Sequence, residues 1–90
     1  MTFDEWADDI GSRVTAAVPD VNVKRKIDDL YRWIHAGKEC QIYAISDSLA
    51  AFVVLRRDGL ATVCPFTCHV EISAGSEEDV ARRIIGWFGR

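Results

Sequence analysis

The residues of this sequence best suited to chemistry are thiols and imidazoles. Cys64 and Cys68 are four residues apart and His69 follows directly, while Cys40 and His35 lie earlier in the chain. Thiolate and imidazole are the ligands of tetrahedral zinc sites. Structural zinc commonly uses two paired ligand clusters, however, and only one C-x-x-x-C pair occurs here. Cys68 and His69 would also point to opposite faces of a strand. We therefore expect no metal and no other cofactor.

A cysteine nucleophile is the second chemistry to consider. It needs a base within hydrogen-bond reach and a lowered thiol pKa. Cys40 follows Lys38 closely, but no spacing in the sequence brings a histidine to it. The sequence also lacks a glycine-rich phosphate loop, a G-x-S-x-G turn and an H-E-x-x-H motif. We therefore expect three free thiols and a protein that is not an enzyme.

Carboxylates and aromatic side chains are the remaining functional candidates. Most acidic residues lie at expected helix starts, where capping and the helix dipole explain them, although an acidic ridge could also meet a basic partner protein. Trp33 lies beside the apolar stripe of its expected helix, and it could belong to a binding hot spot or pack at the rim of the sheet. The residues expected to bind a partner are Asp4, Glu5, Asp8, Asp9, Tyr31, Arg32, Trp33, Tyr43, His69 and Glu71.

Length and composition restrict the class of protein. Ninety residues, 49% of them hydrophobic and 28% charged, predict a single globular domain over 1–90. A net charge of −3 gives no reason to expect direct nucleic-acid binding. No apolar run approaches the roughly 20 residues of a membrane helix, and the first residues do not resemble a signal peptide. With an odd number of cysteines, these features favour a cytoplasmic protein.

Helices are expected on both sides of a central β region. Residues 2–5 fit a capping box, and an apolar stripe at helical spacing follows until Pro19 ends it. A second helix is expected over 20–36, with Gly37 just past its end. Its apolar stripe would consist of Val23, Ile27, Leu30, Tyr31 and Ile34. A last helix is expected from Ser76, with three acidic residues in its first turn.

Four strands are expected between these helices. The segment 49–57, LAAFVVLRR, has an unbroken apolar middle and predicts a central strand buried on both faces. Asp58-Gly59 favours a type I′ hairpin turn after it. The other strands are expected over 39–46, 60–64 and 67–73, with a bend at Pro65-Phe66. The order ααββββα predicts an α+β domain with two N-terminal helices, a four-stranded antiparallel meander and a C-terminal helix.

The expected helices could pack on this sheet in two ways. Three helices could cover both of its faces. Alternatively, all helices lie on one face and a second copy of the chain buries the other, including Phe52 or Val53. We accordingly expect a monomer or a homodimer.

Several short features from residue 30 onward occur in a familiar order. They are Trp33 and Gly37, the segment Gln41-Ile42-Tyr43, the segment from Val70 to Gly75, and Trp87. This order resembles that of small phage-encoded proteins with a GNAT-like, acetyltransferase-like half-domain. Acetyltransferases of that superfamily hold the acyl-CoA pyrophosphate on an R/Q-x-x-G-x-G/A turn. Ala74-Gly75-Ser76 lacks that motif, so the resemblance implies that cofactor binding has been lost.

The expected function is the binding of another protein without catalysis. The resemblance to phage-encoded proteins implies an inhibitor of host machinery, of the anti-CRISPR or anti-defence kind. One alternative is a degenerate acetyltransferase that still binds acyl-CoA. Another is a structural subunit of an oligomer.

Overall fold

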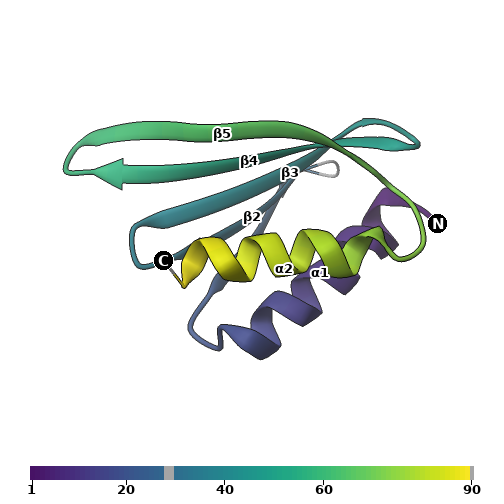
Figure 1. Cartoon of the computed structure of the whole chain (residues 1–90), viewed down its shortest axis with the longest axis horizontal. Helices are drawn as coiled ribbons and strands as arrows, with labels where there is room; N and C mark the ends of the chain where they lie inside the picture. The colour runs from purple at the N-terminus through teal and green to yellow at the C-terminus, as the bar shows by residue number, and fades with distance from the viewer. Residues whose placement is uncertain (28–29, 90) are drawn as a thin grey trace.

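The chain forms a five-stranded antiparallel sheet with two helices packed on one of its faces (Figure 1). This computed structural model describes residues 1–27 and 30–89. Its elements are α1 (Phe3–Ala17), β1 (Asn22–Ile27), β2 (Leu30–His35), β3 (Lys38–Ser46), β4 (Leu49–Asp58), β5 (Ala61–Glu71) and α2 (Ser76–Phe88). The strands lie side by side in chain order, β1-β2-β3-β4-β5. The α+β class and the antiparallel meander are confirmed. Five strands and two helices replace the expected four and three.

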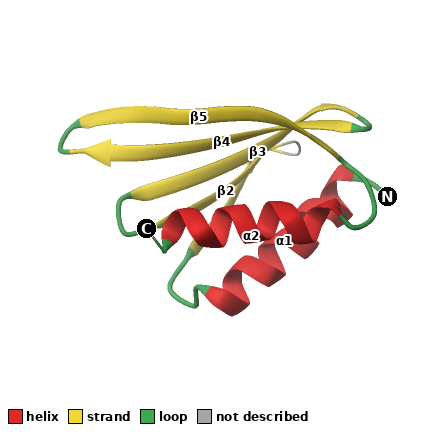
Figure 2. Cartoon of the chain, viewed as in Figure 1, coloured by secondary structure: helices red, strands yellow, loops and turns green. Residues whose placement is uncertain are grey.

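The expected second helix is wrong, because its residues form the β1–β2 hairpin (Figure 2). Asp28 and Asp29, within that expected helix, lie outside the described residues. The apolar residues of this segment fit a period of two as well as a helical period. Tyr31 and Trp33 alternate inward from β2 and are buried, with Arg32 between them on the other face. Aromatic and β-branched residues pack well on a pleated sheet, which favours the strand.

Gly37 ends no helix but completes the tight turn between β2 and β3. His35 pairs with Lys38, which leaves Ala36 and Gly37 as the two loop residues. Their φ angles are 50° and 78°, and a type I′ turn requires positive φ at both central positions. Glycine adopts this conformation freely, whereas alanine is strained in it.

The strand expected over 49–57 is confirmed as β4. The turn after it and the strand that follows differ from the expectation. Asp58 pairs with Ala61, so the turn residues are Gly59 and Leu60. Gly59 has a φ of 60° and Leu60 does not have a positive φ, which fits a type II′ turn rather than type I′. The strands expected on either side of Pro65 are one strand, β5. The expected bend is a β-bulge, at which Cys64 and Pro65 face Leu55.

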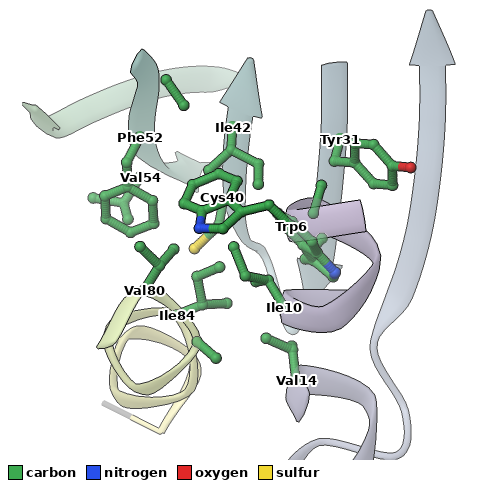
Figure 3. Packing of buried hydrophobic residues seen from close by; sticks show 14 of the residues in the cluster. Trp6, Ile10, Val14, Tyr31, Cys40, Ile42, Phe52, Val54, Val80 and Ile84 are labelled. Atoms are coloured by element: carbon green, nitrogen blue, oxygen red, sulfur yellow. The ribbon is translucent and has the colours of Figure 1, made fainter. Parts of the chain in front are cut away.

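The core lies between the sheet and the two helices (Figure 3). Trp6, Ile10 and Val14 of α1 meet Val80 and Ile84 of α2 against the inward side chains of the sheet. Those inward side chains include Tyr31, Trp33, Cys40, Ile42, Phe52 and Val54. Gly11 lies against Trp33, whose indole atoms would be 3.7–3.9 Å from an added Cβ. Neither described helix has the length and apolar character needed to cross a membrane.

The second face of the sheet is not covered by the helices, which corrects the expectation for 49–57. Ala50, Phe52 and Val54 of β4 point toward the helices and are buried. Val53 and Leu55 point the other way and remain partly exposed. In Figure 1, α1 and α2 lie together on the same side of the strands. Among the described residues, therefore, one layer of helices faces one layer of sheet, and the outer side of the sheet is open.

Candidate protein-binding surface

The uncovered side of the sheet can be mapped from the strand register. Residues paired directly across an antiparallel sheet point to the same face. Gln41 pairs with Arg32 and Val53, and Tyr43 pairs with Leu30 and Ala51. We call the resulting surface the open face. Its residues are Leu30, Arg32 and Ile34 of β2, Glu39, Gln41 and Tyr43 of β3, Leu49, Ala51, Val53, Leu55 and Arg57 of β4, and Thr62, Thr67, His69 and Glu71 of β5.

Apolar side chains form a strip on the open face, along β4 and in the row of Tyr43. Tyr43 is 41% exposed. Leu30 lies beside it in the same row of the sheet, Val53 lies one row away, and Ile34 and Leu55 lie in the next row, with Glu39; all four side chains are half-buried. Covering such side chains contributes roughly 25 cal/mol for each Å² removed from water. Contiguous apolar surface with a polar rim is typical of a site where another protein binds.

A polar cluster crosses the open face beside this apolar area. Arg32 Nη2 lies 3.1 Å from Glu39 Oε1, and Gln41 Nε2 donates to the other carboxylate oxygen. The Arg32 and Glu39 side chains are only 25% and 17% exposed. The cluster lines a shallow depression of about 450 Å³ that Leu55 and Arg57 also border. These charges are thus already largely removed from water and neutralise each other.

The two ends of the open face carry opposite charges. Arg57 lies at one end, where its backbone N–H donates to Gly37 O at 3.0 Å. Glu71 lies at the other end, paired with Leu49 across the ladder. Both side chains are exposed, and neither forms an ion pair with another described residue. Arg57 and Leu49, the partner of Glu71, are eight positions apart on β4. This spacing corresponds to roughly 27 Å between the two ends of the face.

Four of the residues expected to bind a partner lie on the open face. They are Arg32, Tyr43, His69 and Glu71, from three different strands. Tyr43 and His69 belong to one row of the sheet, with Ala51 between them. The fold thus brings together residues that are up to 39 positions apart in the sequence.

The other six lie elsewhere. Trp33, expected at a partly exposed position, is fully buried beneath α1. Tyr31 is also buried, and its hydroxyl donates to Asp8 Oδ1 at 2.8 Å, which ties β2 to α1. Asp9 pairs with Arg13 within α1. Asp4 and Glu5 lie in the first turn of that helix, where the Glu5 amide donates to the Thr2 hydroxyl. The acidic residues of α1 are therefore on the opposite side of the molecule from the open face.

Sequence reasoning missed most of the apolar part of this surface. Leu30 and Ile34 were assigned to the stripe of a helix, although with Arg32 they alternate along β2. Leu55 and Arg57 were placed on a strand expected to be buried on both faces. The period-two pattern of β2 is the signal that could have identified the first pair.

The thiols and imidazoles do not form a cluster. Cys40 is buried in the core, and burial together with nearby Glu39 raises the pKa of its thiol. Cys64 is exposed on the β5 bulge, while Cys68 faces α2, where Arg83 Nη1 lies 3.8 Å from its sulfur. Over residues 1–27 and 30–89, no three histidine, cysteine or acidic side chains are grouped closely enough to hold a metal ion.

The start of α2 is not shaped as a phosphate cradle. The Gly75 N–H donates to Glu77 Oε1 at 2.8 Å, so the turn binds its own carboxylate. Glu77, Glu78 and Asp79 make the first turn acidic, which disfavours a pyrophosphate there.

No protein-family model, no curated protein and no solved structure matches this chain. The resemblance to GNAT-like phage proteins therefore stays a prediction. The function proposed below rests on the geometry of the open face.

Proposed function

We propose that this chain is a non-enzymatic protein-binding module whose contact surface is the open face. The observation that carries the proposal is the one-sided layering of the fold. Both helices cover one side of the sheet, and half-buried apolar side chains remain on the other side around Tyr43. An antiparallel sheet can face water on one side, but that side is then normally polar. An apolar outer side is better explained by a partner that covers it.

The shape of the surface favours a protein over a small molecule. The depression beside Arg32 is open to solvent and lined mostly by polar and charged side chains, whereas small ligands are usually enclosed in concave, largely apolar pockets. Tyr43 offers a large aromatic anchor, and aromatic and arginine side chains dominate the binding energy of protein interfaces. Arg57 and Glu71 supply a charged rim. Apolar and polar contacts are mixed in this way at many protein–protein interfaces.

The open face changes the chemistry expected of the partner. A basic partner was expected on account of the acidic residues of α1, which lie on the far side of the sheet. The open face instead combines an apolar strip and a neutralised polar cluster with one positive and one negative end. The matching surface is apolar and carries both signs of charge. Inhibition of host machinery stays a prediction, since no residue of the open face distinguishes it from other protein binding.

Site-specific photo-crosslinking in the native cells tests this proposal. Tyr43 on the open face and Phe66 on the inward side of β5 are both aromatic, and they are 41% and 44% exposed. A benzophenone amino acid can replace either one conservatively. We expect discrete protein adducts from position 43 and none of the same mass from position 66. Equal labelling from both positions, or none from position 43, would contradict the proposal.

A further inference from the structure

The charge and shape of the open face indicate what covers it. Resting on the function proposed above, we infer that the occupant is a second copy of this chain, packed sheet against sheet with its strands reversed end to end. The two-fold axis would lie in the plane of the interface, perpendicular to the strands. Such a C2 contact uses the same surface twice, so this surface must be complementary to itself.

The charges at the two ends of the face meet that requirement only in the reversed orientation. Arg57 and Glu71 lie at opposite ends, and neither is neutralised by another described residue. Reversal brings the Arg57 end of each copy to the Glu71 end of the other. Stacking with the ends aligned would instead place like charges together, which is costly at an interface. The two diagonal charge pairs of the reversed dimer therefore select its orientation.

The side-chain sizes along the face fit the same arrangement. The row of Arg32, Gln41, Val53 and Thr67 lies at the middle of the face. The row containing Tyr43 and Ala51 lies on one side of it, and the row containing Glu39 and Leu55 lies on the other. Reversal about the middle row sets Leu55 of one copy over Ala51 of the other, a large side chain over a small one. It also sets Tyr43 over Glu39.

The polar cluster of the face can enter this contact at modest cost. The reversal also sets Arg32 over Arg32 of the other copy, but each of these side chains is neutralised by its own Glu39 and is already largely removed from water, so docking adds little to the desolvation of either charge. A carboxylate has acceptor capacity beyond two hydrogen bonds. The Tyr43 hydroxyl of the second copy can therefore donate to Glu39 without displacing Arg32 or Gln41.

The size of the face is sufficient for a weak to moderate dimer. Four strand spacings of about 4.8 Å and a length of roughly 27 Å give about 500 Å² in projection. Two such faces therefore bury on the order of 1,000 Å², without the additional accessible area of their protruding side chains. This area lies in the lower range of specific interfaces. We therefore expect self-association in the micromolar range, detectable as a concentration-dependent change in mass.

Sedimentation equilibrium of charge-reversal variants tests both the occupant and its orientation. Arg57→Glu and Glu71→Arg should each weaken the dimer by roughly fivefold or more, because each creates two like-charge contacts. The double variant should regain an association constant close to that of the wild type. The two residues are roughly 27 Å apart within one copy, so this recovery can arise only between copies. Arg82→Glu, an equal charge change on the exposed side of α2, should leave association unchanged.

The outcomes separate this inference from the proposed function. A wild-type chain that stays monomeric at all concentrations overturns the homodimer. So does a dimer whose strength does not respond to the charge reversals. In either case, a crosslinked adduct at position 43 with a mass other than twice that of the chain would still support a protein-binding open face. Absence of both the dimer and any adduct specific to position 43 would overturn the two proposals together.

Discussion

Trp6 Nε1 donates a hydrogen bond to Ser76 Oγ at 2.8 Å, and this bond joins the two helices through residues that are 70 positions apart in the sequence. The same hydroxyl oxygen lies 2.7 Å from the Ser73 carbonyl and 2.8 Å from the Glu71 carbonyl. Ser76 therefore connects the end of β5, the start of α2 and the buried face of α1. These contacts tie both helices to the end of β5.

Replacing Ser76 with alanine should lower the free energy of unfolding by about 1–3 kcal/mol. The cause is the buried Trp6 indole N–H, which would lose its acceptor. Urea denaturation followed by tryptophan fluorescence measures the loss. Ser73→Ala is the matched control, because Ser73 contributes its backbone to this network, and it should change stability by less than about 0.5 kcal/mol. Equal losses in the two variants would contradict this role of the Ser76 hydroxyl.

Gly11 of α1 should tolerate alanine but not leucine. An added Cβ would lie 3.7 Å from the nearest atom of Trp33, an ordinary contact, and alanine favours helix by about 1 kcal/mol. A leucine side chain would extend further into the fully buried indole and should cost roughly 1–3 kcal/mol. Gly86 of α2 has no atom within 4 Å of its added Cβ. Gly86→Leu should therefore be tolerated, and similar melting curves for the two leucine variants would show that Gly11 does not require a small side chain.

Ala36 is the strained position of the β2–β3 turn. Its φ of 50° is a left-handed conformation that costs an L-residue about 1–2 kcal/mol. Ala36→Asn creates the Asn-Gly pair preferred in type I′ turns and should raise stability by about 1 kcal/mol. For a domain of this size, that gain shifts the melting temperature upward by roughly 4–8 °C. Gly37→Ala should act in the opposite direction, and a lower melting temperature for Ala36→Asn would argue against this turn geometry.

The three thiols should differ sharply in reactivity. Cys64 is exposed, Cys68 is half-buried and Cys40 is enclosed in the core with a raised pKa. Because the thiolate is the reactive form, alkylation of the native protein should modify Cys64 first and Cys40 only on unfolding. Mass spectrometry after timed iodoacetamide treatment gives the order. Early labelling of Cys40 would contradict its placement in the core.

The raised pKa of Cys40 also predicts a loss of stability at alkaline pH. The unfolded chain releases this thiol proton near pH 8.5, while the native state keeps it to higher pH. The unfolded state then binds fewer protons, so the free energy of unfolding falls as the pH rises above about 8.5. Cys40→Val removes the titrating group at similar volume. Its stability should fall less than that of the wild type between neutral pH and pH 10, and parallel pH profiles would exclude the thiol as the cause.

The helices and strands with the clearest local signals could be identified from the sequence. The capping box at Thr2, the apolar run of β4 and the acidic start of α2 each placed an element correctly. The β1–β2 hairpin was missed because its apolar residues satisfy two periods at once. Its identity is decided by long-range packing of Tyr31 and Trp33 beneath α1. The continuity of β5 through Pro65 was also missed, since a bulge accommodates the absent N–H.

The candidate surface was only partly accessible to sequence reasoning. Tyr43, His69 and Glu71 were among the residues expected to bind a partner, and the strand register places all three on the open face. Arg32 was included on account of Trp33, whose burial removes that reason. Which side of the sheet remains uncovered depends on where both helices pack. That placement is a property of the tertiary fold and is not contained in any one segment.

The bulge at Cys64 and Pro65 disfavours the addition of further strands at the β5 edge of the sheet. β5 is a long outer strand, and an unpaired strand edge can recruit further chains into fibrils. An irregular backbone lacking one amide hydrogen interrupts the regular ladder that such growth requires. In the proposed dimer, assembly would use the flat side of the sheet and would stop once two molecules have met.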